Sequence, residues 1–195
     1  MLIETPYGPA TGSAVQEIEL RTPSTSMMPI DGGRSKQTGD ALLLRVDGKN
    51  YFMPLTTCAS LVDDAIRSNK VEPAEARFQG NNAETLRVFA RSKGRAVIED
   101  GARWMKLPSR SIWLTRFADE RDFRTSQSFR LGDPPFAWSL RSVTVETVDE
   151  PITRQTIERL PWLKTLTAAE VKAAPRYNGY TIGEIKVLSD LFKGK

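Results

Sequence analysis

Residues 42–53, LLLRVDGKNYFM, decide the fold: a hydrophobic run is followed by Asp47-Gly48 and then by an aromatic and apolar run. Residues 96–105, AVIEDGARWM, repeat this order around Asp100-Gly101. Asp-Gly between hydrophobic runs is the strongest short signal for a β-hairpin, because a type I′ turn needs positive φ at both central residues. We therefore predict two β-hairpins, at about 41–55 and 95–107.

Other segments predict helices and one long strand. In residues 136–148 the hydrophobic positions alternate and then slip by one near Arg141-Ser142, which predicts a strand with a bulge there. Apolar stripes predict helices at 59–67, capped by Thr56-Thr57, and at 83–91, capped by Asn82. Pro73 predicts the start of a further short helical segment. A last helix is expected around residues 112–117, after the second hairpin.

The two Asp-Gly units lie 53 residues apart, from Asp47 to Asp100. At this offset Tyr51 aligns with Trp104, and Phe52 aligns with Met105. Two interpretations stay open: a duplicated β-β-α unit, or two ordinary hairpins that are each followed by a helix.

The expected fold class is α+β, with three parts along the chain. Residues 1–40 are rich in Pro and Gly and predict an extended arm with one strand near 15–20, docked on its own body or on a neighbouring subunit. Residues 41–148 are the expected core domain, an antiparallel sheet of the two hairpins and the long strand with helices packed on it. Residues 149–195 predict a small helical segment, begun by Pro151 and continued by capping boxes at 167–170 and 181–184.

Composition limits the chemistry that the chain can perform. It contains no histidine and one cysteine, Cys58. Serine or cysteine catalysis with a histidine base is therefore excluded, and a structural zinc site is effectively excluded as well. We expect no cofactor, no metal and no enzymatic activity. No apolar run approaches a membrane span, and no signal peptide is evident, so we expect a cytoplasmic or virion protein without membrane contact.

Positive charge is concentrated in the middle of the chain. Residues 1–86 carry 8 basic and 11 acidic side chains, residues 87–141 carry 12 and 6, and residues 142–195 carry 8 and 7. Ten of the twelve central cations are Arg, and the same segment holds 8 of the 16 aromatic residues. Such composition suits a protein interface or nucleic acid, against the alternative of a solvated face whose Arg stems cover Trp side chains. The candidate binding residues are Arg87, Arg91, Lys93, Arg95, Arg103, Trp104, Lys106, Arg110, Trp113 and Arg116.

Three smaller motifs have plain structural interpretations. Residues 31–36, DGGRSK, could form an anion-binding nest, but a turn is favoured. The acidic residues of 119–122 could hold Mg²⁺ for nuclease chemistry, which is a weak alternative. Cys58 is interpreted as a small buried residue rather than as a nucleophile.

The function expected from these features is that of a non-enzymatic structural or interaction protein, a subunit of a larger assembly of the phage or viral-particle type. Its expected partners are other protein subunits. The alternatives are a nucleic-acid-binding protein that uses the segment 87–141, and a small protein inhibitor of another enzyme.

Overall fold

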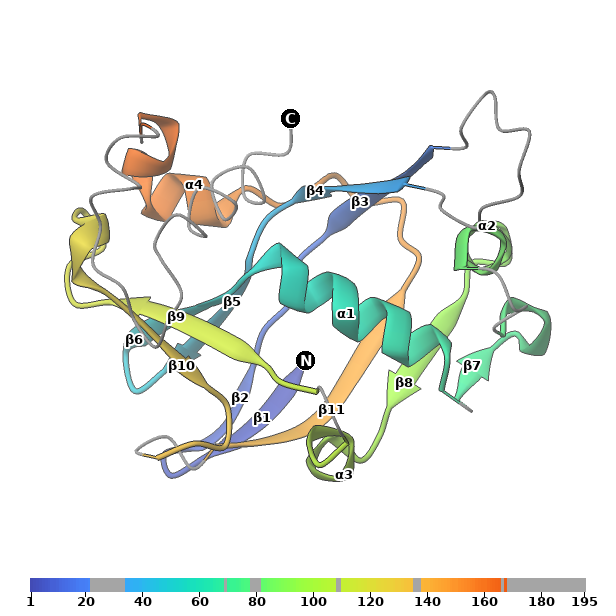
Figure 1. Cartoon of the computed structure of the whole chain (residues 1–195), viewed down its shortest axis with the longest axis horizontal. Coiled ribbons are helices and arrows are strands. Elements are labelled where there is room, and N and C mark those ends of the chain that lie inside the picture. The colour runs from blue at the N-terminus through green and yellow to red at the C-terminus, as the bar shows by residue number, and fades with distance from the viewer. Residues whose placement is uncertain are drawn as a thin grey trace.

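The computed structural model describes residues 1–21, 34–68, 70–77, 82–107, 110–134, 138–165 and 167. This part of the chain is a mixed α+β structure with four α-helices and three antiparallel sheets, of five, four and two strands (Figure 1). Asp31–Gly33 and the two C-terminal capping boxes lie outside the described residues, apart from Thr167.

The five-stranded sheet has the order β2-β1-β11-β8-β7. Its strands are β1 (Leu2–Thr5), β2 (Gly8–Thr11), β7 (Val71–Glu72), β8 (Arg95–Ile98) and β11 (Ser139–Glu146). Strand β11 pairs with β1 on one side and with β8 on the other. The prediction of an extended arm is therefore wrong for residues 1–11, which form a hairpin inside the sheet. Ion pairing of Glu4 with Arg141, at 3.1 Å, joins β1 to β11.

The predicted strand and its bulge are both present in β11. Leu2 is opposite Ser142, whereas Ile3 is opposite Leu140, so Arg141 is the extra residue on β11. Leu140 and Val143 are both buried, which explains the phase slip in the hydrophobic pattern.

The four-stranded sheet has the order β10-β9-β6-β5. Its strands are β5 (Leu42–Val46), β6 (Lys49–Met53), β9 (Trp113–Phe117) and β10 (Ser126–Arg130). The first predicted hairpin is confirmed, because β5 pairs with β6 in register and the turn residues Asp47 and Gly48 have φ values of 48° and 69°. A separate ribbon of β3 (Gln16–Arg21) and β4 (Arg34–Gly39) contains the strand predicted near 15–20.

The second predicted hairpin is wrong. After β8 the chain enters a short helix, α3 (Gly101–Met105), and Asp100 is its N-cap: its carboxylate accepts a hydrogen bond from the Arg103 N–H at 2.9 Å. Asp100 has a φ of −108°, so no type I′ turn exists here. Asp favours a helix N-cap as strongly as it favours a turn, and Gly101 fits below Leu140, where a Cβ would clash.

The helix expected around residues 112–117 is also wrong, since this segment is β9. Buried Leu114 faces the main core, and Thr115 lies opposite Phe52 of β6. Tertiary burial on both faces overrides the local helical spacing of the apolar residues. The two Asp-Gly units consequently differ, β-β-α in the first and β-α-β in the second, which argues against a duplicated β-β-α unit.

The helices predicted at 59–67 and 83–91 are confirmed as α1 (Leu55–Ile66) and α2 (Asn82–Arg91), and η1 (Ala74–Ala76) follows Pro73. Helix α1 begins four residues earlier than predicted, and Pro54 rather than a threonine is its N-cap. The expected helix after Pro151 begins later, as α4 (Gln155–Arg159), and is followed by η3 (Pro161–Lys164). A last 3₁₀ turn, η2 (Phe123–Thr125), leads into β10.

Two hydrophobic clusters hold these elements together. The larger one joins Leu61 and Ala65 of α1 to buried residues of both large sheets, such as Leu140 and Leu114. The smaller one covers the opposite face of the four-stranded sheet, where Phe52 of β6 meets Leu160 and Leu163 beside α4. Within the described ranges, no helix combines the length and apolar character that crossing a membrane requires.

Candidate functional site

The ten candidate binding residues are distributed over several elements. Arg87 and Arg91 lie on α2 and Lys93 follows it, whereas Trp113 and Arg116 lie on β9. Helix α2 lies toward the right end of the long axis of the molecule, whereas strand β9 lies in the left half (Figure 1). The remaining candidates are Arg95 on β8, Arg103 and Trp104 on α3, and Lys106 and Arg110 after α3. The structure therefore brings only a subset of the candidates together.

Several candidate cations already have partners within the protein. Arg87 pairs with Glu84 at 3.3 Å, and Lys93 pairs with Asp149 at 3.0 Å. Arg116 donates twice to the amide oxygen of Gln127, at 2.9 and 2.6 Å. These contacts are exposed, so their free-energy contributions are small. They nevertheless show that these three cations already bind acceptors within the protein.

The other cations differ in their surroundings. Arg95 lies between Glu72 of β7 and Glu146 of β11 in the strand register. Arg91, Arg103 and Lys106 are exposed. Lys93 and Arg95 are exposed as well, so a partner could reach these five side chains directly, although Lys93 is already paired with Asp149.

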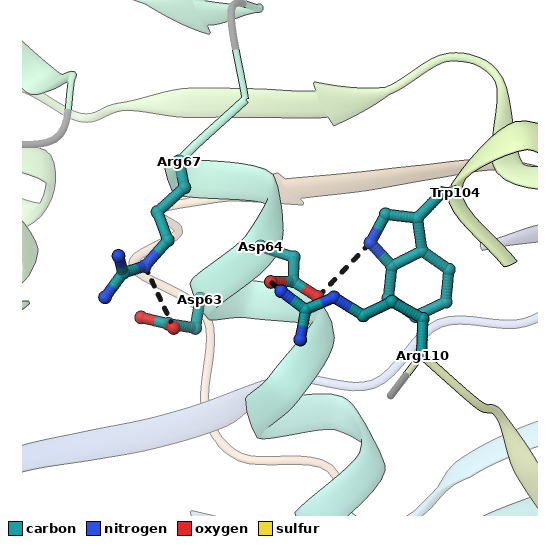
Figure 2. Close-up of polar contacts among 5 residues, drawn as sticks. All are labelled: Asp63, Asp64, Arg67, Trp104 and Arg110. Carbon is teal, nitrogen blue, oxygen red and sulfur yellow. Dashed lines mark hydrogen bonds and ion pairs between the residues drawn. The ribbon is translucent and has the colours of Figure 1, made fainter. Parts of the chain in front are cut away.

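Trp104 and Arg110 meet at one buried carboxylate, that of Asp64 on α1 (Figure 2). The indole Nε1–H of Trp104 donates to Oδ2 of Asp64 at 3.2 Å, and the Arg110 guanidinium contacts Oδ1 at 2.6 Å. The Asp64 side chain is 7% exposed, whereas that of Arg110 is 38% exposed. Asp64 therefore ties α3 and the start of the β9 segment to the central helix.

The burial of Asp64 affects the pKa of its carboxyl group. Desolvation raises the pKa of Asp64 above its usual value, although the Arg110 charge and the Trp104 hydrogen bond oppose the shift. The neighbouring Asp63 is exposed and pairs with Arg67 one turn along the helix, at 3.1 Å. Each carboxylate oxygen of Asp64 has one donor, so the side chain holds α3 and the segment around Arg110 against α1.

The substitution Asp64→Asn is expected to lower the free energy of unfolding by about 1–3 kcal/mol, because one donor loses its acceptor and Arg110 loses its counter-charge. Asp63→Asn is the matched control, and it should change stability by no more than about 0.5 kcal/mol, since its ion pair is exposed. Urea unfolding followed by circular dichroism measures both. Equal effects of the two substitutions would contradict a structural role that is specific to Asp64.

Asp40 is a second buried carboxylate, and the sequence reading did not single it out. It is 2% exposed, and both of its oxygens accept the backbone N–H of Thr156, at 3.1 and 2.9 Å. Burial raises its pKa, and the hydrogen bonds from Thr156 oppose this shift. Asp40 precedes β5 and so connects the four-stranded sheet to the start of α4.

Cys58 and the acidic loop 119–122 were the two other candidates for reactive or metal-binding groups, and both make contacts within the fold. Cys58 is buried and burial raises the pKa of its thiol to about 11, which removes the thiolate that a nucleophile needs at neutral pH. In the acidic loop 119–122, Asp119 and Asp122 accept backbone N–H groups of the loop itself, and Glu120 accepts the Asn50 amide at 2.6 Å. Among the described residues, no group of three metal-ligating side chains is present.

A shallow pocket, with a volume of about 370 Å³, is lined by residues of β1, β2 and β11 of the five-stranded sheet and by Leu43 and Gln155. Its polar side chains are hydroxyls and one amide, from Thr11, Ser13, Ser142, Thr144 and Gln155. Such a lining can hydrogen-bond a polar group, and none of these side chains titrates near neutral pH.

The chain matches no family model, no curated protein and no solved structure. Its function is therefore inferred from its residues and their geometry. A sequence signal for Asp64 does exist, since it lies three residues after Leu61 within the apolar stripe of the helix, where a carboxylate needs a buried partner. No comparable signal marks Asp40, because its partner Thr156 is 116 positions away.

Proposed function

We propose that this chain is a non-enzymatic structural or interaction protein, a subunit of a larger assembly of the phage or viral-particle type that binds neighbouring protein chains. The observation that carries the proposal is how the acidic side chains are used. The carboxylates of Asp40, Asp64 and Asp100 accept hydrogen bonds from other elements or cap a helix. In an enzyme, catalytic carboxylates instead need an oxygen that faces the substrate.

The exposed part of the basic segment also supports a protein partner. Arg103 and Lys106 lie close together on and after α3, and both are exposed. Arg is enriched at protein interfaces, where its planar guanidinium forms several hydrogen bonds at once. Nucleic acid is a less favoured partner, because it requires unpaired cations along one continuous surface, and Arg87, Lys93 and Arg110 have acidic partners here.

Two measurements test the proposal together: sedimentation velocity of the purified chain across a concentration series, and cross-linking mass spectrometry in extracts of its native source. We expect association with itself, or reproducible cross-links to a defined protein partner. A chain that sediments as a monomer at every concentration, and that cross-links only to itself within one molecule, would be incompatible with an assembly subunit.

A further inference from the structure

Strand β10 forms one edge of the four-stranded sheet and, in the described part of the chain, pairs only with β9. Antiparallel pairing alternates between residues whose backbone groups point to the partner strand and residues whose groups point away. The backbone N–H of Leu131 donates to the Ile112 carbonyl, and the N–H of Ala118 donates to the Thr125 carbonyl. The backbone groups of residues 125, 127, 129 and 131 therefore point toward β9. The backbone groups of Ser126, Ser128 and Arg130 therefore face away from the sheet.

Two of these outward groups are already used within the protein. The N–H of Ser126 donates to the carbonyl of Phe123, and the carbonyl of Arg130 accepts the N–H of Asp133 at 3.2 Å. No described residue bonds the other four groups at this edge: the carbonyl of Ser126, the N–H and carbonyl of Ser128, and the N–H of Arg130. The open set thus contains two donors and two acceptors, placed symmetrically about Ser128.

The other edges of the two larger sheets are protected in the described ranges. Strand β2 contains Pro9, which lacks an N–H, and β7 is two residues long and is followed by Pro73. The outer edge of β5 lies against Gly12, where an added Cβ would be 2.5 Å from the Leu43 carbonyl oxygen. Strand β10 carries none of these devices, and proteins rarely leave such an edge open without a partner.

We propose that the edge of β10 pairs with β10 of a second copy of this chain, antiparallel and about a two-fold axis at Ser128. In this register each open donor meets an open acceptor: the Ser128 N–H meets the Ser128 carbonyl of the other copy, and the Arg130 N–H meets the Ser126 carbonyl. The two groups that are already bonded within each chain also lie opposite each other: the Ser126 N–H of one copy faces the Arg130 carbonyl of the other. An unrelated strand could also meet the four open groups, but it would leave one carbonyl and one N–H of its own without partners opposite the bonded Ser126 N–H and Arg130 carbonyl. A second copy avoids this cost and is therefore the favoured occupant.

The side chains and charges of β10 permit the same register. Arg130 lies opposite Ser126, Gln127 lies opposite Phe129, and Ser128 lies opposite itself, so no like charges are directly opposed. Each end of the strand is flanked by both signs of charge. Arg124 and Asp122 precede the strand, and Arg130 and Asp133 mark its other end. The pairing would join two four-stranded sheets into one continuous sheet of eight strands.

This inference deepens the proposed function and rests on it, and substitutions at the two-fold position test it. Ser128→Asp places two carboxylates opposite each other, and we expect dimerisation to weaken on the order of tenfold or more. Within the monomer, an aspartate at this position can still accept the Thr115 hydroxyl that now bonds Ser128 at 2.9 Å. Ser128→Lys should weaken the dimer in the same way, and an equimolar mixture of the two variants should restore it. Sedimentation velocity measures all three samples.

Thr144→Asp is the matched control, since it adds the same charge to an exposed position of β11, a central strand, and should leave the dimer unchanged. Circular dichroism and thermal unfolding of each variant show whether the fold is retained. Restoration in the mixture supports the inference even if one variant alone is less stable.

Three outcomes would overturn the inference in different ways. A wild-type dimer that persists in both Ser128 variants places the contact elsewhere and leaves the proposed function intact. A mixture that stays monomeric argues against charge-matched pairing at Ser128. A wild-type chain that is monomeric at all concentrations removes the self-pairing, and the cross-linking experiment then decides separately whether the chain binds other proteins.

Discussion

Replacing Phe52 by alanine is expected to lower the free energy of unfolding by about 3–5 kcal/mol, the usual range for removing a fully buried aromatic side chain. Phe52 is 1% exposed and lies in the smaller hydrophobic cluster between β6 and the α4 segment. Its ring meets that of Phe117 edge to face, with centroids 5.8 Å apart. The substitution would leave a cavity below Leu160 and Leu163, because the sheet and the helix cannot both close in on it.

Chemical denaturation monitored by circular dichroism gives this free energy directly. Tyr7→Ala is a suitable control, because Tyr7 is 69% exposed and its removal should change stability by no more than about 0.5 kcal/mol. A loss below about 1 kcal/mol for Phe52→Ala would mean that α4 and η3 do not cover this face of the sheet.

Replacing Gly101 by alanine is expected to cost about 1–3 kcal/mol, through overpacking rather than through backbone strain. The new Cβ would meet Leu140, and it would lie 2.7 Å from the carbonyl oxygen and 2.8 Å from the carbonyl carbon. Because these are backbone atoms of the central strand β11, relief requires α3 or β11 to move.

Gly48 provides the comparison, since it has a φ of +69° and no atom within 4 Å of an added Cβ. Asparagine tolerates this left-handed conformation better than other residues, so Gly48→Asn should cost less than about 1 kcal/mol. Gly101→Asn should cost at least as much as Gly101→Ala, because its side chain is larger. If asparagine were tolerated equally well at both glycines, the assignment of Asp100-Gly101 to a helix start would be contradicted.

Much of the fold could be predicted wherever local chemistry decides the structure. The Asp47-Gly48 turn requires positive φ at two successive residues, and few alternatives suit Asp-Gly between two hydrophobic runs. The slip at Arg141 predicted a bulge, because a strand that keeps one face buried must insert a residue to change phase. The stripes of α1 and α2 likewise specified helices, with errors confined to their first residues and caps.

The errors arose where one local pattern suits two structures. Asp-Gly satisfies both a type I′ turn and a helix N-terminus, and only the packing of Gly101 against Leu140 selects the helix. The segment 112–117 has helical spacing, but it becomes β9 because Leu114 and Thr115 are buried on opposite faces of a sheet. The candidate basic segment was predicted from composition, which carries no information on how far apart α2 and β9 lie.

By itself, then, the sequence determined the elements whose rules operate within a few residues: the first hairpin, the bulged strand and the helical stripes. Tertiary structure alone decided which strands are neighbours. It paired residues 2–5 with β11, which lies more than 130 positions later in the sequence. It also gave Asp64 and Asp40 their distant partners, and it left β10 at the edge of a sheet. The physical reason is that strand pairing and carboxylate burial depend on groups that are far apart in sequence and that only the folded chain brings within hydrogen-bonding distance.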